Sequence, residues 1–323
     1  MKWGILATGT IAEKFAGTIR SMKEEGQSLQ AVASRKEERA AEFAGRHGIP
    51  KCYGSYEALF ADPDVEAVYI GTPNNLHYEN CLGALEAGKH VLCEKPLTLT
   101  AKEAAGLYEI AEEKGLLLLE GLWIRFLPLY GRMQELLRSG AIGEIIWARS
   151  DYGFIAKGAR RERKFRSELG GGALYDIGIY NIGFLQMVMG EDPSSFTSSQ
   201  VKMNEFGTDS HSTLEFAYRS GRQAQCTQVI GEEIARNALI TGTKGSIFLK
   251  DFQMAECMEI TYEDGHSEQV TMPFEINGFE YEIRAFEKAV AEGSTCLEPY
   301  LPRESVANMS LLEEVRRSWG MEF

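Results

Sequence analysis

Apolar and polar positions alternate in two different rhythms along this chain, and the change falls near residue 122. Before it, short apolar runs alternate with segments in which apolar residues recur at helical spacing. Strands separated by helices of about ten residues are typical of a parallel, doubly wound α/β sheet. The expected strands are Lys2–Leu6, Leu29–Ser34, Val65–Gly71, His90–Cys93 and Leu116–Leu119, and the expected helices are Ile11–Lys23, Lys36–His47, Tyr78–Ala87 and Ala101–Lys114.

After residue 122 the pattern indicates a different architecture. From Phe196 to Met272, alternating segments broken by turn signals predict antiparallel strands of one open sheet. The other expected elements are helices Leu129–Ser139, Ala173–Met189, Glu280–Glu292 and Pro302–Ser318, and strand Ile145–Asp151. We therefore expect two domains, residues 1–122 with a parallel sheet and residues 123–323 with an α+β fold and a mostly antiparallel open sheet.

Composition narrows the range of partners. The chain has 323 residues and a formal charge of −13, which would repel a polyanion such as nucleic acid. Its six cysteines are scattered, without a C-x-x-C or a Cys/His cluster, which favours a reducing cytoplasm and argues against disulfides and metal sites. The chain starts directly with a strand and has no apolar run near the roughly 20 residues of a membrane helix. We expect a cytoplasmic protein that acts on small molecules.

The turn after the first strand suggests a dinucleotide site. It contains Thr8, Gly9, Thr10 and Ile11 between the small residues Ala7 and Ala12. A dinucleotide fingerprint needs small residues where the backbone turns and where it approaches the pyrophosphate. The first amides of the following helix would then hold the phosphates. Because this turn also has the strand before it and the helix after it, we favour a Rossmann-type site over a turn that binds nothing.

The end of the second strand favours NADP over NAD. An NAD enzyme usually has an acidic residue there, whereas this chain has Ser34 and Arg35, with Arg39 one helical turn later. A hydroxyl and guanidinium groups are suited to bind a 2′-phosphate. The alternative is a solvated helix start, because Arg is usually a surface residue.

Two further strand ends add candidate residues. After the third expected strand, Thr72 and Pro73 could line the nicotinamide ribose and Asn74 could bond a ribose hydroxyl, while His77 is either a cofactor contact or an ordinary helix-start residue. After the fourth, Glu94 and Lys95 precede Pro96. Ligands of open parallel sheets bind at the carboxyl ends of the strands, so Lys95 is placed to reach a substrate on a nicotinamide ring.

These segments together resemble the glucose–fructose oxidoreductase/inositol dehydrogenase (Gfo/Idh/MocA) family. The matching runs are Trp3–Leu6, Gly9–Ala12, Gly71–Asn74, Glu94–Pro96 and Gly170–Tyr180. The runs 120–126 and 278–283 are most similar to the branch of dimeric dihydrodiol dehydrogenases and NADP-dependent D-xylose dehydrogenases. Ala7 stands where many members have Gly, which is tolerable where the turn avoids positive φ. Phe279 stands where some members have a Tyr near the cofactor, so we do not assign that contact.

The resemblance implies a catalytic Lys at Lys95 and a second-domain pair at Asp176 and Tyr180. An i, i+4 pair on a helix shares one face. Free Tyr has a pKa near 10 and free Lys near 10.4, so either needs a neighbouring positive charge or desolvation to act as a base at neutral pH. We assign Tyr180 as acid/base, Lys95 as the residue that holds the substrate oxygen, and Asp176 as an orienting group. The roles of Tyr180 and Lys95 could be exchanged.

The expected function is NADP-dependent hydride transfer to or from a hydroxyl or carbonyl carbon of a sugar, polyol or trans-dihydrodiol. Trp123 and Arg125 could line the cofactor or sugar side of the site, and the basic cluster Arg160–Arg166 is expected to be a solvated lid that could also meet phosphates or an acidic sugar. The resemblance further implies a homodimer through the C-terminal sheet. Alternatives are a non-catalytic nucleotide-sensing regulator, which would not need Lys95, Asp176 and Tyr180 as a set, and an NAD-dependent glycosidase, which Arg35 disfavours.

Overall fold

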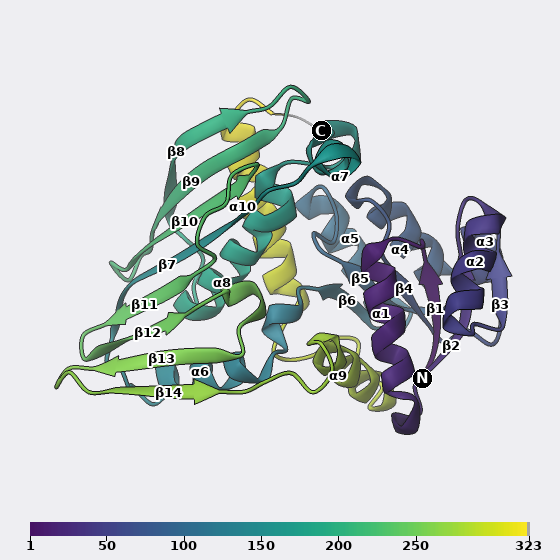
Figure 1. The fold of residues 1–323 in the computed structure, drawn as a ribbon, viewed down its shortest axis with the longest axis horizontal. Helices are drawn as coiled ribbons and strands as arrows, with labels where there is room; N and C mark the ends of the chain where they lie inside the picture. Colours follow the sequence, from purple (N-terminus) through teal and green to yellow (C-terminus); the bar gives the residue numbers. More distant parts are fainter. Residues whose placement is uncertain (322–323) are drawn as a thin grey trace. The chain divides into compact units, whose positions relative to one another are not determined.

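The chain forms two compact units, which are seen in the computed structural model of Figure 1. The structure describes residues 1–321. The first unit comprises Met1–Trp123 and Glu275–Met309, and the second comprises Ile124–Phe274 and the described residues from Ser310 on. We expected all residues after 122 in the second domain, but the segment Glu275–Met309 packs with the first unit. Its helical pattern carried no information about which sheet it would cover.

The first unit contains a six-stranded parallel sheet with the strand order β3-β2-β1-β4-β5-β6. This confirms the predicted doubly wound fold. The residues of β4 are buried throughout, as expected for a strand with both faces of its sheet covered. The strands are β1 (Lys2–Leu6), β2 (Ser28–Ala33), β3 (Lys51–Tyr53), β4 (Ala67–Ile70), β5 (His90–Glu94) and β6 (Leu118–Gly121). The edge strand β3 was not predicted, because three half-buried residues are too few to form a recognisable pattern.

Helices cover this sheet, and one of them, α9, comes from a distant part of the chain. The α-helices of the first unit are α1 (Thr10–Ser21), α2 (Glu37–His47), α3 (Tyr56–Phe60), α4 (His77–Glu86), α5 (Ala101–Glu113) and α9 (Phe279–Ala291), and short 3₁₀ turns are η1 (Lys23–Glu25), η2 (Asn74–Leu76) and η3 (Trp123–Arg125). Helix α9 packs against α1, and the two lie side by side in Figure 1. The start of α5 is fixed by a capping box, in which Thr100 and Glu103 accept each other's backbone amides.

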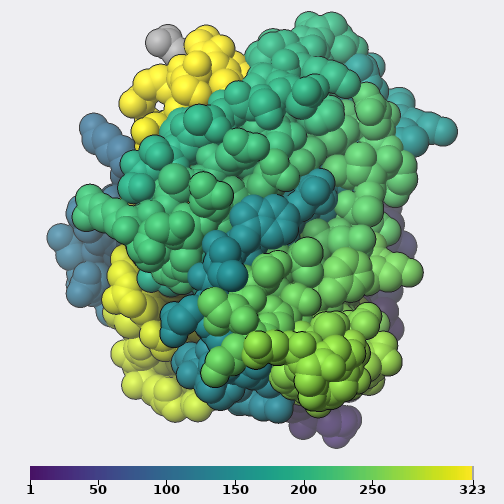
Figure 2. Space-filling view, turned by 90° about the vertical axis from the view of Figure 1, so that its left-hand side faces the viewer, coloured from purple at the N-terminus to yellow at the C-terminus, as the bar shows by residue number. Residues whose placement is uncertain are grey.

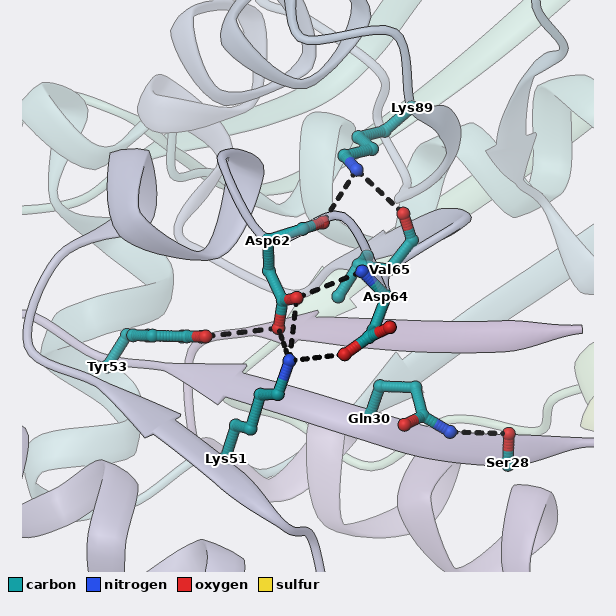
Figure 3. A network of polar contacts seen from close by, with 8 residues as sticks. All are labelled: Ser28, Gln30, Lys51, Tyr53, Asp62, Asp64, Val65 and Lys89. Carbon is teal, nitrogen blue, oxygen red and sulfur yellow. Dashed lines mark hydrogen bonds and ion pairs between the residues drawn. The ribbon is translucent and has the colours of Figure 1, made fainter.

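A polar network joins the loops that precede β4 and β5 (Figure 3). Lys51 bridges the carboxylates of Asp62 and Asp64, and Tyr53 donates to Asp62 at 3.0 Å. The buried Lys89 ammonium donates to two carbonyls, those of Asp62 (2.8 Å) and Val65 (2.7 Å). These loops lie at the amino ends of their strands, opposite the edge where parallel sheets bind ligands. The network therefore stabilises the fold away from the candidate site.

The second unit contains an eight-stranded sheet with the order β14-β13-β12-β11-β7-β10-β9-β8. Strands β7 and β10 pair in parallel and the other neighbours pair antiparallel, which confirms the predicted mostly antiparallel sheet. The strands are β7 (Ile145–Phe154), β8 (Ser195–Met203), β9 (Asp209–Ala217), β10 (Gln223–Ile230), β11 (Ala238–Gly242), β12 (Gly245–Leu249), β13 (Cys257–Tyr262) and β14 (Ser267–Thr271).

One face of this sheet is covered by helix α8, which packs against β7 and β10. The helical elements here are α6 (Pro128–Arg138), α7 (Gly158–Phe165), η4 (Ser167–Leu169), the π-helix η5 (Leu174–Gly178), α8 (Ile179–Met189), η6 (Phe252–Met254) and α10 (Pro302–Ser318), which begins in the first unit. One expectation needs correction, because the predicted α-helix from Ala173 starts with a π-helical turn. The basic stretch forms most of the helix α7.

Figure 2 shows the opposite face of the sheet, over which its strands lie open to view. Alternation along the strands places Trp147, Leu239 and Phe248 on this outward face, because Ala148, Ile240 and other alternate residues are buried. Leu239 is paired across the sheet with Phe248, which is 37% exposed. This face therefore carries an apolar centre. No helix in the described part of the chain is long and apolar enough to cross a membrane.

Candidate active site

The turn between β1 and α1 has the shape of a phosphate-binding turn. An added Cβ at Gly9 would meet no atom within 4 Å, and no side chain caps the helix that starts after it. The first amides of α1 are therefore available to an anion. Ala7, however, has a φ of +75°, so this turn does not avoid positive φ as the Ala in place of Gly had suggested. The structure holds Ala7 there through its amide, which donates to the Ala33 carbonyl at 3.0 Å.

The end of β2 lies beside this turn, since Leu6 pairs with Ala33. Ser34 follows directly and is buried, while Arg35 and Arg39 are exposed. Neither arginine forms an ion pair with a described residue, although the chain is rich in carboxylates. The residues present therefore fit an anionic ribose substituent at this edge of the sheet.

The turn after β4 is built around His77, which is fully buried. Its Nδ1 lies 2.8 Å from the carbonyl of Pro96 and its Nε2 lies 3.0 Å from that of Thr72. Burial lowers the pKa of His77, while the carbonyls of Pro96 and Thr72 act in the opposite direction. Thr72 in turn accepts a hydrogen bond from Asn80 at 3.1 Å. His77 thus connects two loops and has both ring nitrogens against backbone.

The loop that carries Lys95 is held by a buried carboxyl group. Glu120, in β6, is fully buried and accepts from the amide of Leu97 at 3.0 Å. Its other oxygen accepts from the hydroxyls of Tyr300 (2.7 Å) and Ser305 (2.6 Å). Burial raises the pKa of Glu120 above its ordinary value despite these donors. Among residues 91–98, only Glu94 and Lys95 are partly exposed, so the loop presents these two side chains from a buried frame.

A second buried polar cluster lies around Glu94. Tyr69 donates to Glu94 at 2.6 Å, and burial raises the pKa of Glu94. Glu282, in α9, is 1% exposed, and its Oε2 has no hydrogen-bond partner in the described structure. Burial, and then the charge of Glu94, raise the pKa of Glu282 well above its ordinary value. Burial and the charge of Glu94 therefore both disfavour the ionised form of Glu282.

Lys14 completes this cluster and accounts for Trp123. The Lys14 ammonium lies 4.4 Å from the centre of the Trp123 ring and 4.8 Å from that of Phe279. Burial lowers the pKa of Lys14, although Glu94 and Glu282 oppose this shift. Trp123 therefore packs on a lysine of α1. Arg125, in the second unit, donates from Nη1 to the Gly183 carbonyl at 3.5 Å.

In the second unit, Asp176 and Tyr180 project from one continuous helical segment. Between Gly171 and Tyr180 they are the two residues that are partly exposed, and the others are buried. Asp176 lies in the π-helix η5, a rare form that occurs often at functional sites. Its carboxylate is 2.5 Å from the ammonium of Lys164 in α7. Tyr180 makes an edge contact with Tyr152, with 5.7 Å between ring centres.

The start of η5 is fixed by a glycine turn and by a buried carboxyl group. Asp209 is 2% exposed and accepts from the amide of Leu174 at 2.9 Å. Gly172 has a φ of +116°, and an added Cβ there would lie 2.5 Å from Oδ1 of Asp209. Burial raises the pKa of Asp209 to about 7, although the Leu174 amide and the Arg316 charge oppose this. The position of Asp176 thus depends on a residue from β9.

Within the first unit the predicted residues gather at one edge. Thr8–Ile11, Ser34, Thr72–Asn74 and Lys95 follow β1, β2, β4 and β5, which are adjacent parallel strands. Sequence reasoning missed Glu120, Glu282, Asp209 and Lys164. Glu120 and Glu282 could have been suspected from acidic residues among apolar neighbours, whereas Asp209 lies in a polar stretch that gave no such signal. Lys164 belongs to the basic cluster Arg160–Arg166, which was recognised, but its ion pair with Asp176 was not predicted.

Comparison with known proteins agrees with this geometry. Residues 1–122 match a family described as an oxidoreductase family with an NAD-binding Rossmann fold, and residues 130–248 match the GFO/IDH/MocA C-terminal domain. Trans-1,2-dihydrobenzene-1,2-diol dehydrogenase of Danio rerio is 32% identical over 332 residues, which cover 100% of this chain and 98% of the relative. The human enzyme of the same name is also 32% identical, with the same coverage.

Solved structures show the same fold. A 3-ketoreductase from Actinomadura kijaniata, crystallised with NADP and TDP-benzene, has a TM-score of 0.87 and 29% identity and covers 98% of this chain and 97% of its own. An aldose-aldose oxidoreductase from Caulobacter crescentus has a TM-score of 0.88 at 22% identity, with 99% and 98% of the two chains covered. The parallel nucleotide-binding sheet, the second open sheet and these full-length relatives lead to one conclusion: this chain belongs to the GFO/IDH/MocA oxidoreductase family and is an enzyme of the dehydrogenase/reductase type.

Proposed function

We propose that this enzyme transfers a hydride between NADP and a hydroxyl or carbonyl carbon of a sugar, polyol or trans-dihydrodiol. The carrying observation is the pattern of exposure: Lys95 in one unit, and Asp176 and Tyr180 in the other, are presented from otherwise buried segments. Relatives that match along their whole length are named dihydrodiol dehydrogenases. These support a diol or sugar substrate.

NADP is favoured over NAD by the residues at the end of β2. Thr8, Gly9, Thr10 and Ile11 would hold the pyrophosphate at the start of α1, while Ser34, Arg35 and Arg39 would hold the 2′-phosphate. When bound, the nicotinamide supplies the carbon that accepts or donates the hydride. Thr72, Pro73 and Asn74 are the proposed contacts of its ribose. We assign His77 a supporting role instead, because backbone carbonyls face both of its ring nitrogens.

In the proposed reaction Lys95 holds the substrate oxygen and Tyr180 moves its proton. The loop of Lys95 is fixed on one side by Glu120 through the Leu97 amide, and on the other by His77 through the Pro96 carbonyl. This fixed position favours a defined distance between the ammonium and a substrate oxygen. For oxidation, Tyr180 must be deprotonated so that it can accept the proton of the substrate hydroxyl.

Asp176 would orient a second hydroxyl of the substrate. Lys164 contributes to this role, because its ammonium lies 2.5 Å from the carboxylate and offsets the charge of Asp176 at a half-buried position. An ionised Asp176 accepts hydrogen bonds from hydroxyl groups and cannot donate, which favours diols and sugars over ketones without neighbouring hydroxyls.

The decisive experiment replaces the two proton-handling residues. Lys95→Met and Tyr180→Phe should each lower turnover at least 100-fold, the lower range for a general acid–base residue, and leave NADPH binding unchanged. Turnover is followed by NADPH absorbance with sugars, polyols and a trans-dihydrodiol in both directions, and NADPH binding by fluorescence titration. Lys102→Met and Tyr262→Phe are matched controls at positions outside the site. Wild-type turnover in Lys95→Met or Tyr180→Phe would refute the proposal.

The cofactor preference has a separate test. Arg35→Asp should lower kcat/KM for NADP relative to NAD by about tenfold or more, because a carboxylate repels the 2′-phosphate and accepts from the 2′-hydroxyl instead. Arg39→Asp should have a smaller effect in the same direction. An unchanged ratio in both variants would show that the 2′-phosphate binds elsewhere.

The outward face of the second sheet is the proposed surface of a homodimer. Trp147, Leu239 and Phe248 place apolar side chains at its centre. A self-complementary sheet face is suited to a twofold dimer. We also propose a cytoplasmic location, in which the six cysteines, all free in this structure, stay reduced.

A further inference from the structure

Helix α7 concentrates positive charge in an acidic protein. Six of the ten residues from 157 to 166 are Lys or Arg and one is Glu, while the whole chain carries −13. Like charges at this density repel one another along a helix. Carboxylate partners would reduce this repulsion, and the structure shows which of the six cations have one.

Three of the six cations pair with carboxylates nearby. Arg161 binds Glu205 at 3.0 Å, Arg166 binds Glu168 at 2.7 Å, and Lys164 binds Asp176 at 2.5 Å. The other three, Lys157, Arg160 and Arg163, are exposed and form no ion pair with a described residue. The carboxylates that contact the cations of residues 157–166 are thus already paired, and the charges of Lys157, Arg160 and Arg163 are not neutralised by an ion pair within residues 1–321.

The helix is fixed relative to Asp176. Phe165 is 1% exposed and packs in one apolar cluster with Ala173 and Ile177 on either side of Asp176. The amides of Gly171 and Gly172, which precede the π-helix, donate to the carbonyls of Arg166, directly after α7 (3.0 Å), and of Lys164 in α7 (2.8 Å). The basic helix and the proposed catalytic segment are therefore one rigid piece of the second unit.

Of the three cations that form no ion pair in the described chain, Arg160 lines up with Lys164, the cation that touches Asp176. Arg160 and Lys164 are one helical turn apart, and both lie over the ring of Phe154, at 5.1 Å and 5.4 Å from its centre. A turn of helix rises about 5.4 Å. A sugar with one hydroxyl at Asp176 would therefore have a substituent on its far side within reach of Arg160.

From this arrangement we infer that the enzyme acts on a hydroxylated substrate that carries an anionic substituent, a phosphate or a carboxylate, and that Lys157, Arg160 and Arg163 bind this substituent. The inference rests on the proposed function and adds the charge of its substrate. The overall field of the protein repels anions, so selectivity for an anionic substrate requires a local basic surface of this kind.

The test compares neutral and anionic substrates of one shape. KM is measured for D-glucose, D-glucose 6-phosphate and D-glucuronate with the wild-type enzyme, with Lys157→Gln/Arg160→Gln/Arg163→Gln, and with the control Arg138→Gln/Arg219→Gln/Lys250→Gln, which removes the same charge at exposed positions elsewhere. We expect a lower KM for one or both anionic sugars, which the first triple variant raises about tenfold, as three exposed charge contacts would give. The KM for glucose and the control variant should not change, and salt should raise only the anionic KM.

A second measurement separates this inference from the proposed function. Calorimetric titration with glucose 6-phosphate and glucuronate reports binding without turnover. If no sugar is oxidised but the wild type binds an anionic sugar and the triple variant does not, the proposed reaction is wrong and the anion site stands. Equal KM values for neutral and anionic sugars, or a triple variant that raises the KM of NADP instead, would overturn the inference.

Discussion

Asp209→Asn should make the protein more stable at neutral pH, although it removes a carboxylate that accepts a backbone hydrogen bond. The Asp209 side chain is almost fully buried at the start of the π-helix, and burial raises its pKa from 3.8 to about 7. Asn has nearly the same shape and still offers an oxygen to the Leu174 amide, which is 2.9 Å away. The substitution therefore removes the titration and keeps the contact.

The size of the effect follows from the pKa shift. The folded state binds the proton more tightly than the unfolded state, so the contribution of Asp209 to stability is full below pH 4. It is lost as the pH rises to about 7. At 1.36 kcal/mol per pKa unit, a rise from 3.8 to about 7 corresponds to a loss of about 4 kcal/mol. The asparagine side chain does not titrate, so this loss does not occur in the Asp209→Asn variant. The difference in free energy of unfolding between variant and wild type should therefore grow by about 4 kcal/mol between pH 4 and pH 8.

Urea unfolding at pH 4, 5, 6, 7 and 8, followed by circular dichroism, measures this difference. Asp62→Asn is the opposite control. Burial raises the pKa of Asp62, but hydrogen bonds from Lys51, the Asp64 amide and Tyr53 outweigh it and lower the pKa. The Asp62 carboxylate therefore stabilises the folded state at pH values above its unfolded pKa. Asp62→Asn should lower the free energy of unfolding at pH 7, and by less at pH 4. If the free energy of unfolding of Asp209→Asn relative to wild type stays constant or falls between pH 4 and pH 8, the raised pKa of Asp209 is refuted.

Three further predictions follow from single features of the fold. Ala7→Gly should raise the free energy of unfolding by about 1 kcal/mol in urea titrations, because glycine adopts the φ of +75° without strain; a destabilised variant would contradict this. Lys89→Met should lower it by about 3 kcal/mol, because two carbonyls lose an ammonium donor (Figure 3), whereas an unchanged midpoint would show that water replaces Lys89. Leu239→Glu/Phe248→Glu should convert the proposed dimer to a monomer in sedimentation velocity, and a wild type that sediments as a monomer would remove the proposed interface.

Local patterns were sufficient for the parallel sheet and for the edge at which its candidate residues lie. The apolar runs of β1, β4 and β5 are short and continuous because both faces of each strand are covered, and such runs are visible without tertiary information. The small residues after β1 and the Lys after β5 sit at strand ends, and parallel strands bring their carboxyl ends to one edge. The short elements β3 and α3 were missed because a few residues do not establish a period.

Other features could not be predicted because they depend on residues far apart in the chain. Glu120 holds the loop of Lys95 through the Leu97 amide and is itself satisfied by donors near residue 300, and Asp209 holds the π-helix from a different strand. In the linear sequence Glu120 is one acid in an apolar run, and Asp209 is one polar residue among several. Only burial shows that each must be satisfied by specific donors. The positive φ of Ala7 could not be predicted either, because an alanine gives no local sign that surrounding contacts hold it in a left-handed conformation.

The sequence by itself determined the order of strands and helices, the nucleotide-binding turn and the chemical types at the candidate site, because these depend on residues that are neighbours or one helical turn apart. Tertiary structure decided that Glu275–Met309 joins the first unit, that Lys164 pairs with Asp176, and that buried carboxyl groups hold the segments of Lys95 and Asp176 in place. The physical reason is that a buried polar group takes its energy from the partners that enclose it, and those partners are set by packing and not by adjacency in the chain.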